Sequence, residues 1–343
     1  MRYKLILSIC ILISCRNGFA QLQVDSLFSS KSPLDLAISM SIKEVRKSKE
    51  DTVYQSHKLF YYNGAGKLDS MRVGLKGRGN FRLRECYYPP LWMSFEKKKV
   101  KGTPFEGNKK IKVVLPCHGN DDGDNLIIRE YLCYTIFEVI SPYSIKSRLA
   151  NIDITELRNR KSKTYKVKAI LLEDMGKMAK RMHAKETKTS SMNPTLFDDT
   201  SCLRFDLFQY LISNTDVSSA YEHNSKVIYK NPKYIPVPYD FDMSGVVDAP
   251  YAVVSKIGDV QLPIDNVRQR YYRGYCRPDS LTEFIRQEFI SKKDKILGCT
   301  DELNGLLSEK EIREIRSYLA EFFDILVDDK SFKRQVLSTC RKL

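Results

Sequence analysis

The first half of the chain alternates apolar and polar residues over short stretches, a pattern typical of β-strands with one buried face. Residues 57–62 and 70–76 are β-prone, and Asn63-Gly64-Ala65-Gly66 between them predicts a hairpin turn. A helix is expected over about 125–140, where it ends before Pro142. Further strands are predicted over 92–95, 111–115, 148–154 and 167–173.

Beyond about residue 174 the apolar residues recur with the spacing of helices. A helix expected over 199–213 carries on one face Leu203, Leu207, Phe208 and Leu211. Ser308 and Glu311 form a capping box, and the helix that follows carries Ile312, Ile315, Leu319, Phe322 and Leu326. Between these helices we expect two short strands, over 226–229 and 234–237. The lysine-rich residues 161–188 predict a partly loop-like connector, about which the two halves can hinge.

The length and composition indicate a globular protein. Of the 343 residues, 42% are hydrophobic and 29% are charged, which excludes a disordered or fibrous chain. At roughly 150 residues per domain, the length suggests two domains or one two-lobed domain. We therefore divide the chain into a signal peptide (1–20), a β-rich part with one main helix (21–173) and a mainly helical part that carries an acidic site (174–343).

The N-terminus has the pattern of a secretory signal peptide. A basic start precedes an apolar run over 5–14, and Gly18-Phe19-Ala20 places small residues before a cleavage site at Gln21. Leu12-Ile13-Ser14-Cys15 also resembles a lipobox, so cleavage after Ala20, which we favour, and lipidation of Cys15 both stay open. Either outcome predicts a periplasmic or extracellular protein. Membrane contact is expected only if Cys15 is lipidated, because no later stretch contains the ~18 apolar residues of a transmembrane helix.

An exported chain resides in an oxidising compartment, so its cysteines are expected to form disulfides. Two of the nine cysteines belong to the signal peptide, and seven is an odd number, so at least one stays free. We predict a disulfide between Cys86 and Cys117, which flank a basic segment, and a buried thiol at Cys133. The net charge of +15 favours an anionic partner. Nucleic acid is not expected, because no nucleic-acid-binding motif is present and the chain is exported.

The residues best suited to chemistry form an acidic cluster in the second half. Asn214-Thr215-Asp216 is followed by Glu222-His223-Asn224 and, after the two short strands, by Tyr239-Asp240-Phe241-Asp242. Phosphoryl transfer needs one carboxylate to orient the attacking hydroxyl and others to hold the metal ions that neutralise phosphate charge. The alternative is that Asn214 and Asp216 form turns and that Asp240 and Asp242 cap a strand end.

Two features of the first half are candidates for binding phosphate. Glu130 lies on an otherwise apolar helix face and needs a cation, and Lys112 on the preceding strand is its natural partner. Such a lysine–glutamate pair holds the α- and β-phosphates in kinases. The alternative is that Glu130 reaches water and that Lys112 is an ordinary surface lysine. The second feature is a glycine-rich basic turn with Arg78, Gly74-Leu75-Lys76-Gly77-Arg78-Gly79-Asn80.

The order of these elements resembles the spore-coat protein H (CotH) kinase family, and most closely a group of secreted Bacteroidetes proteins. The resemblance covers about residues 78–245. Its carriers are Arg78-Gly79-Asn80, the strand with Lys112, the helix with Glu130, the strand over 169–174 and the acidic cluster. The resemblance implies an α+β, two-lobed, protein-kinase-like fold with a β-rich N-terminal lobe and a helical C-terminal lobe.

The same resemblance implies roles for the acidic cluster. Asp216 would be the catalytic aspartate, and Asn224 and Asp240 would be metal ligands. Asp242 would share or replace the role of Asp240. The implied cofactors are ATP and Mg²⁺.

The nucleotide would be bound largely by the first half. Lys112 would hold its phosphates beside Glu130 and Arg78, and Glu173 would mark the region that contacts adenine. The predicted function is an exported kinase that transfers a phosphoryl group from a nucleotide to a hydroxyl of an unidentified protein acceptor. The alternative is a non-enzymatic cell-envelope binding protein, similar to a pseudokinase.

Overall fold

The computed structural model describes residues 25–343 apart from the short segments 49–52, 119–120, 159–160, 188–190 and 258–259. The predicted signal peptide, with the lipobox at Cys15 and the cleavage site after Ala20, lies outside the described residues. The account below concerns the described part of the chain.

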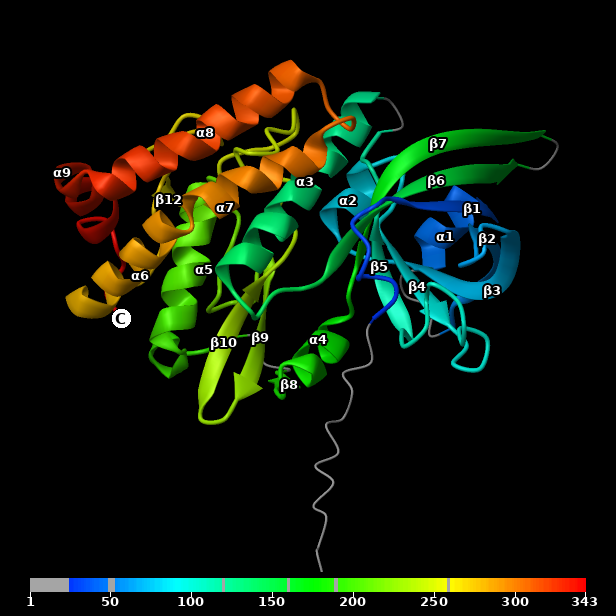
Figure 1. Ribbon diagram of the computed structural model, residues 1–343, viewed down its shortest axis with the longest axis horizontal. Coiled ribbons are helices and arrows are strands. Elements are labelled where there is room, and N and C mark those ends of the chain that lie inside the picture. The colour runs from blue at the N-terminus through cyan, green and yellow to red at the C-terminus, as the bar shows by residue number, and fades with distance from the viewer. Residues whose placement is uncertain (1–24, 49–52, 119–120, 159–160, 188–190, 258–259) are drawn as a thin grey trace, which may run out of the picture.

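Seven strands of the first half close into a barrel (Figure 1). Their order around the barrel is β1-β2-β3-β4-β5-β7-β6. In chain order they are β1 (Leu34–Met40), β2 (Gln55–Tyr62), β3 (Leu68–Gly77), β4 (Leu91–Phe95), β5 (Lys110–Val114), β6 (Ser147–Arg158) and β7 (Lys161–Leu172). Neighbouring strands are antiparallel except for β1 and β6, whose parallel pairing closes the barrel. Two short helices, α1 (Ile42–Lys47) and α2 (Phe81–Glu85), lie in its connections.

The alternation of side chains along the strands explains the barrel core. In β1, Leu36, Ile38 and Met40 are buried inside it, because successive residues of a strand point to opposite faces. The two longest strands, β6 and β7, bury both faces at one end. Their inward side chains join the barrel core, while Leu149, Ile170 and Leu172 belong to a second core shared with the helices.

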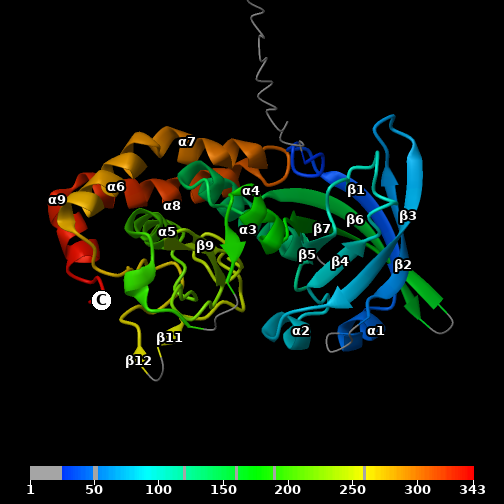
Figure 2. The ribbon, with the colours of Figure 1, turned by 90° about the horizontal axis from the view of Figure 1, so that it is seen from below.

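The helix α3 (Asp121–Ile140) covers the outer face of β6 and β7 and separates the barrel from the other helices (Figure 2). Those helices are α5 (Asp199–Leu211), α6 (Asp279–Ser291), α7 (Lys293–Gly298), α8 (Glu309–Val327) and α9 (Asp329–Phe332). Short 3₁₀ turns occupy Pro194–Leu196 and Cys299–Leu303, and a π turn occupies Lys333–Leu337. The predicted capping box of Ser308 and Glu311 is confirmed at the start of α8.

Two small sheets accompany the helices. The first has the order β10-β9-β8 and the second pairs β11 with β12. Their bounds are β8 (Lys185–Glu186), β9 (Ser225–Lys230), β10 (Lys233–Pro238), β11 (Lys256–Ile257) and β12 (Val260–Gln261). The helix α4 (Met175–Arg181) leads from the barrel into the first of these sheets.

The prediction of a two-lobed protein-kinase-like fold, with a β-rich N-terminal lobe and a helical C-terminal lobe, is wrong. The strands of the first half form a closed mixed barrel, since β1 pairs with both β2 and β6. The second half carries sheets among its helices. Only the mixed α+β class is retained, and the division of the chain at residue 173 stays a prediction.

The prediction of a hinged, loop-like connector over 161–188 is also wrong in its first part. Lys161–Leu172 is the barrel strand β7, which pairs along its whole length with β6. Lys166 and Lys168 alternate with Val167 and Ala169 of the barrel core, and Lys161 and Lys163 lie at the exposed end of the strand. A high lysine content here marks an exposed strand end rather than a loop.

The disulfide predicted between Cys86 and Cys117 is confirmed, and a second one, which was not predicted, joins Cys276 to Cys340. Cys133 is a buried free thiol, as expected, and Cys202 and Cys299 are buried and free as well. Two disulfides are compatible with an exported protein. Among the described residues, no helix has the length and apolar character needed to cross a membrane.

The Cys276–Cys340 disulfide should stabilise the fold measurably, because it joins residues 64 positions apart. In the chain-entropy account, the C276A/C340A variant should lose about 4 kcal/mol of unfolding free energy in a denaturant titration. C133A, which removes a thiol that forms no disulfide, is the control and should cost less. A loss no larger than that of C133A would contradict the prediction.

Candidate functional site

The candidate site lies where the barrel meets α3 and the turn after β10. Lys112 comes from β5, Arg78 follows β3, and Glu130 comes from α3. The acidic cluster approaches from the other side, with Asp240 in the turn after β10 and Asp216 in the loop after α5. The Lys112 ammonium lies 4.2 Å from the ring of Tyr239, the residue before Asp240. The Tyr239 N–H donates to the Asn224 carbonyl oxygen at 3.1 Å, so residues distant in sequence share one region.

The turn that carries Asp240 is pinned to α3. Asp240 has the left-handed φ of 66°, a conformation that aspartate tolerates better than most residues. Its backbone N–H donates to the Tyr134 hydroxyl of α3 at 3.0 Å. The next residue, Phe241, is fully buried and packs its ring 4.6 Å from that of Tyr134 and 5.4 Å from that of Phe208 in α5. The turn therefore holds the Asp240 carboxylate at a defined place beside α3.

Glu130 is met by an arginine that the sequence did not single out. The prediction that Lys112 pairs with Glu130 is wrong, because within the described residues the Lys112 ammonium has no carboxylate oxygen within 4.0 Å. Instead Arg82 of α2 places NH1 3.7 Å from Glu130 Oε2 and Nε 3.9 Å from Asp242 Oδ2. Arg82 NH2 also donates to the Leu115 carbonyl oxygen.

Burial controls the charges of this group. It raises the pKa of Glu130 to about 8, an effect that Arg82 opposes and Asp242 adds to. Burial, and next the charge of Asp240, raise the pKa of Asp242 to about 6. Burial alone would lower the pKa of Arg82, but Asp242 and Glu130 raise it above its usual value. A permanent cation therefore lies between two carboxylates that repel each other.

Lys112 lies on the outer face of the barrel and is 5% exposed. In the register of β4 and β5 it stands opposite Trp92, and its ammonium is 5.5 Å from that ring and 4.2 Å from the ring of Tyr239. Burial and the nearby charge of Arg78 lower its pKa to about 7, although Asp240 opposes the shift. The ammonium is thus desolvated and available to an anion, which would raise its pKa again.

Asp216 is held by three side chains. Asn224 Nδ2 donates to Asp216 Oδ2 at 2.8 Å, while His223 Nε2 and Ser255 Oγ lie 2.9 Å and 3.3 Å from Oδ1. Burial raises the pKa of Asp216, but hydrogen bonding to His223 and the charge of that ring outweigh it, and the net shift is downward. The same hydrogen bond raises the pKa of His223. The pair is a carboxylate beside a readily protonated imidazole.

The backbone around Asp216 is also fixed. Its N–H donates to Asn214 Oδ1 at 3.0 Å, which is the turn chemistry expected of an asparagine two residues earlier. Arg273 donates to the carbonyl oxygen of Thr215. The turn-forming alternative for Asn214 therefore describes a real contact, and that contact serves to position Asp216.

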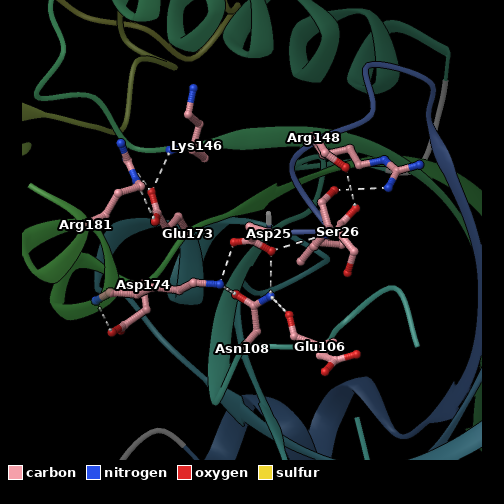
Figure 3. Close-up of polar contacts among 12 residues, drawn as sticks. Asp25, Ser26, Glu106, Asn108, Lys146, Arg148, Glu173, Asp174 and Arg181 are labelled. Atoms are coloured by element: carbon pink, nitrogen blue, oxygen red, sulfur yellow. Dashed lines mark hydrogen bonds and ion pairs between the residues drawn. The ribbon is translucent and has the colours of Figure 1, made fainter. Parts of the chain in front are cut away.

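Glu173 lies in different surroundings from the other predicted nucleotide contacts. Its Oε2 accepts from the Lys146 N–H at 3.1 Å and from Arg181 NH2 at 2.8 Å (Figure 3). It lines a cavity of about 730 Å³ bounded by residues 25–29, residues 106–107 and α4, in which Lys112 and Asp240 take no part. Its predicted contact with adenine stays a prediction.

The glycine-rich segment is a turn only at its end. β3 continues to Gly77, and Gly79 alone among its glycines has a left-handed φ, of 83°. Arg78 donates its N–H to the Pro90 carbonyl oxygen at 2.9 Å and stands 5.5 Å from the Trp92 ring. Arg78 thus belongs to the same group as Lys112.

Sequence reasoning missed several residues of this site. Arg82 lies in a run of charges with no periodic pattern, and Tyr251 and Ser255 lie in a polar stretch far along the chain. The sequence pointed to Arg82 only indirectly. Glu130 on an apolar helix face required a buried cation, but its pattern did not identify Arg82 as that cation. His223 was next to Asn224, and its role became visible only through its hydrogen bond to Asp216.

The residues that could hold a metal are Asp240 and Asn224. In the part of the chain that the structure describes, no three His, Cys, Asp or Glu side chains are grouped to hold one. Mg²⁺, however, usually takes one or two protein oxygens together with phosphates and water. The Asp240 carboxylate forms no hydrogen bond or ion pair with the described residues, whereas Asp242 Oδ2 accepts from Tyr251 at 3.3 Å and faces Arg82. Asp240 therefore fits a metal–phosphate group better than Asp242 does.

Comparison of the chain with protein-family models finds no match, and comparison with curated proteins finds none. The resemblance to the CotH kinase family consequently stays a prediction. The function is inferred below from the geometry of the site.

The raised pKa of Glu130 predicts a pH dependence of stability. A carboxyl whose pKa is higher in the folded state stabilises the fold at low pH, and this contribution is lost as the pH rises from about 4.5 towards about 8. Between pH 5 and pH 8, E130Q should therefore lose less unfolding free energy than the wild type, by about 1.4 kcal/mol or more, the equivalent of one pKa unit. Denaturant titrations at both pH values measure this, with E138Q on the same helix as the control. An unchanged difference would contradict the prediction.

The contact between Asp216 and His223 can be tested by NMR. Because hydrogen bonding to Asp216 raises the pKa of His223, D216N should lower the midpoint of the His223 titration. D248N, which neutralises an exposed carboxylate paired with Arg268, should leave that midpoint in place. Equal midpoints in D216N and the wild type would show that the two side chains do not interact in solution.

Proposed function

We propose that this protein is an exported phosphotransferase that transfers a phosphoryl group from ATP, with Mg²⁺, to a hydroxyl of a protein acceptor. The observation that carries the proposal is the position of Asp216, hydrogen-bonded by His223 and Asn224. The Asn224 carbonyl oxygen also accepts the N–H of Tyr239, which precedes Asp240 and packs on Lys112. The proposal does not need the protein-kinase fold, because a reaction depends on the site and unrelated folds carry the same chemistry.

Lys112 and Arg78 are the proposed phosphate-binding residues. Both stand beside Trp92, and Lys112 is buried with its charge only weakly compensated. A cation taken out of water and left without an adjacent carboxylate binds an incoming phosphate strongly. We assign Lys112 to the phosphates near the transferred group and Arg78 to the barrel side of the nucleotide.

Asp216 is the proposed residue that orients the acceptor hydroxyl. Its lowered pKa keeps it ionised at neutral pH, so it can accept the hydrogen bond of a hydroxyl group and take up its proton as the oxygen attacks. Asn224 and Ser255 hold the carboxylate in place. His223 adds a positive charge beside it when protonated.

Asp240 and Asn224 are the proposed residues that hold Mg²⁺ together with the phosphates. When bound, the ion would neutralise phosphate charge. The repulsion between Asp240 and Asp242, visible in the raised pKa of Asp242, would be relieved by such a cation.

We also propose that the protein works outside the cytoplasm, in the periplasm or the extracellular space, as a lipoprotein if Cys15 is lipidated. The two disulfides and the N-terminal leader pattern support this. Its acceptor would then be an exported protein as well.

Nucleotide binding and transfer are tested on the purified protein and three variants. ATP with Mg²⁺ should raise the melting temperature of the wild type, since a ligand of the native state stabilises it by about 2.7 kcal/mol at 100 times its Kd. K112M should weaken this shift, and D240N should lose its Mg²⁺-dependent part without destabilising the ligand-free protein. D216N should keep the shift while transfer to a protein mixture falls at least about 100-fold.

D248N is the matched control, because Asp248 is an exposed aspartate of the same segment. It should behave as the wild type in both assays. A wild type that ATP and Mg²⁺ do not stabilise would contradict the proposal and favour the non-enzymatic binding protein. Stabilisation without transfer to any acceptor would indicate a pseudokinase-like protein.

A further inference from the structure

Arg82 is a buried cation on one of the shortest helices of the structure. The helix α2 has five residues, too few to be stable by itself. It is held from outside by the Cys86–Cys117 disulfide at its end and by the Tyr87 N–H, which donates to the Cys117 carbonyl oxygen at 2.8 Å. The position of the Arg82 backbone is therefore set by contacts at residues 86 and 117.

A second arginine reinforces this end of α2. Arg46, in the last turn of α1, donates NH2 to the carbonyl oxygens of Cys86 and Tyr87 at 2.7 and 2.8 Å. Its NH1 donates to those of Leu83 and Arg84 at 3.1 and 3.5 Å. Four carbonyl oxygens of one short segment thus share one guanidinium. Such charge-assisted hydrogen bonds are stronger than neutral ones. They hold α2 in place although a helix of this length is not stable by itself.

From this fixed helix the Arg82 side chain reaches two elements of the candidate site. It lies 3.7 Å from Glu130 on α3 and 3.9 Å from Asp242, two residues after Asp240. All three side chains are buried, with exposures of 8% or less. Removing one charge from a buried group leaves the others uncompensated, which is more disruptive than losing an exposed ion pair.

The other contacts of the Asp240 turn with α3 are not ionic. They include the hydrogen bond to the Tyr134 hydroxyl, the packing of Phe241 and the Phe241 N–H, which donates to the Glu130 carboxyl group. Glu130 of α3 and Asp242 of the turn both face the Arg82 guanidinium across this junction. Without the guanidinium, the two buried carboxyl groups would lose the partner they share, and nothing would bridge Asp242 to α3.

We propose that Arg82 is a positioning residue, which holds the Asp240 turn against α3, and that the Cys86–Cys117 disulfide keeps Arg82 in place. The inference rests on the proposed function in one respect, namely that Asp240 helps to hold Mg²⁺ with the bound nucleotide. The position of the turn itself can be measured without any ligand.

Hydrogen exchange followed by mass spectrometry measures that position in the ligand-free protein. In R82M, amides of the turn over 239–244 should exchange about tenfold faster or more than in the wild type, because the buried charges lose their compensation. Amides of α6, which packs mainly against α5, α7 and α8, should exchange at the wild-type rate. R82K, which keeps the charge without the planar fork, should fall between the two.

R84M is the matched control, since Arg84 lies on the same helix with a side chain that is 74% exposed and 4.0 Å from Glu85. It should exchange as the wild type does. In R82M/E130Q/D242N, where both carboxylates are neutral, exchange of the turn should return towards the wild-type rate. C86A/C117A should reproduce the effect of R82M on the turn, and C276A/C340A should not.

Two results would overturn the inference. Equal exchange of the turn in R82M and R84M would mean that Arg82 does not hold it. Acceleration in α6 to the same degree as in the turn would mean that Arg82 supports the whole fold; if R82M does not fold, R82K decides between these results. A wild type that binds no nucleotide would end the proposed function but leave the exchange result intact, whereas a binding wild type should lose Mg²⁺-ATP affinity in R82M and keep it in R84M.

Discussion

The structure depends on the burial of both faces of β6 and β7. One face of these strands completes the barrel core, and Ile170 and Leu172 on the other face pack under α3. A strand that is buried on both sides cannot shift its register without exposing apolar side chains. The barrel and the helices are thus locked together through α3, which also carries Glu130 and holds the Asp240 turn.

Electrostatic pairing at the junction follows from that burial. Glu130 is 1% exposed, so its carboxylate needs a cation or a proton. Arg82 supplies the cation for both Glu130 and Asp242, which leaves Lys112 free of a direct carboxylate partner in the described structure. Arg82 therefore serves as a buried structural cation, whereas Lys112 can bind a ligand. The pairing of Arg82 with Glu130 also explains why the pair of Lys112 and Glu130 predicted from the sequence does not form.

The barrel changes how the resemblance to the CotH kinase family is to be understood. The motifs around Lys112, Asp216 and Asp240 were expected on a two-lobed scaffold, but the strand β1 closes the sheet. The same side chains nevertheless come together. Chemistry at a site depends on which groups meet and how they are solvated, so the motifs inform the proposed reaction more than they inform the fold.

Much of the local structure was predictable from the sequence. The alternation over residues 57–62 and 70–76, the helix before Pro142 and the capping box at Ser308 are set by neighbouring residues, and all of them form as expected. The disulfide at Cys86 was predicted from its flanking position and the export signal. The need for a cation at Glu130 was visible too, because helix periodicity places that residue among apolar ones.

What the sequence could not decide were the partners across long separations. The parallel pairing of β1 with β6 joins residues more than a hundred positions apart. The pattern of apolar residues in either strand does not specify which strand it pairs with. Glu130 took Arg82 instead of Lys112 because α2, fixed by a disulfide, points its guanidinium into the junction, while Lys112 faces Trp92 and Tyr239. The sequence by itself determined the local elements and the chemical types at the site, since these depend on near neighbours. The tertiary structure alone decided the closure of the barrel and the choice of ion pairs, since both depend on packing between distant segments.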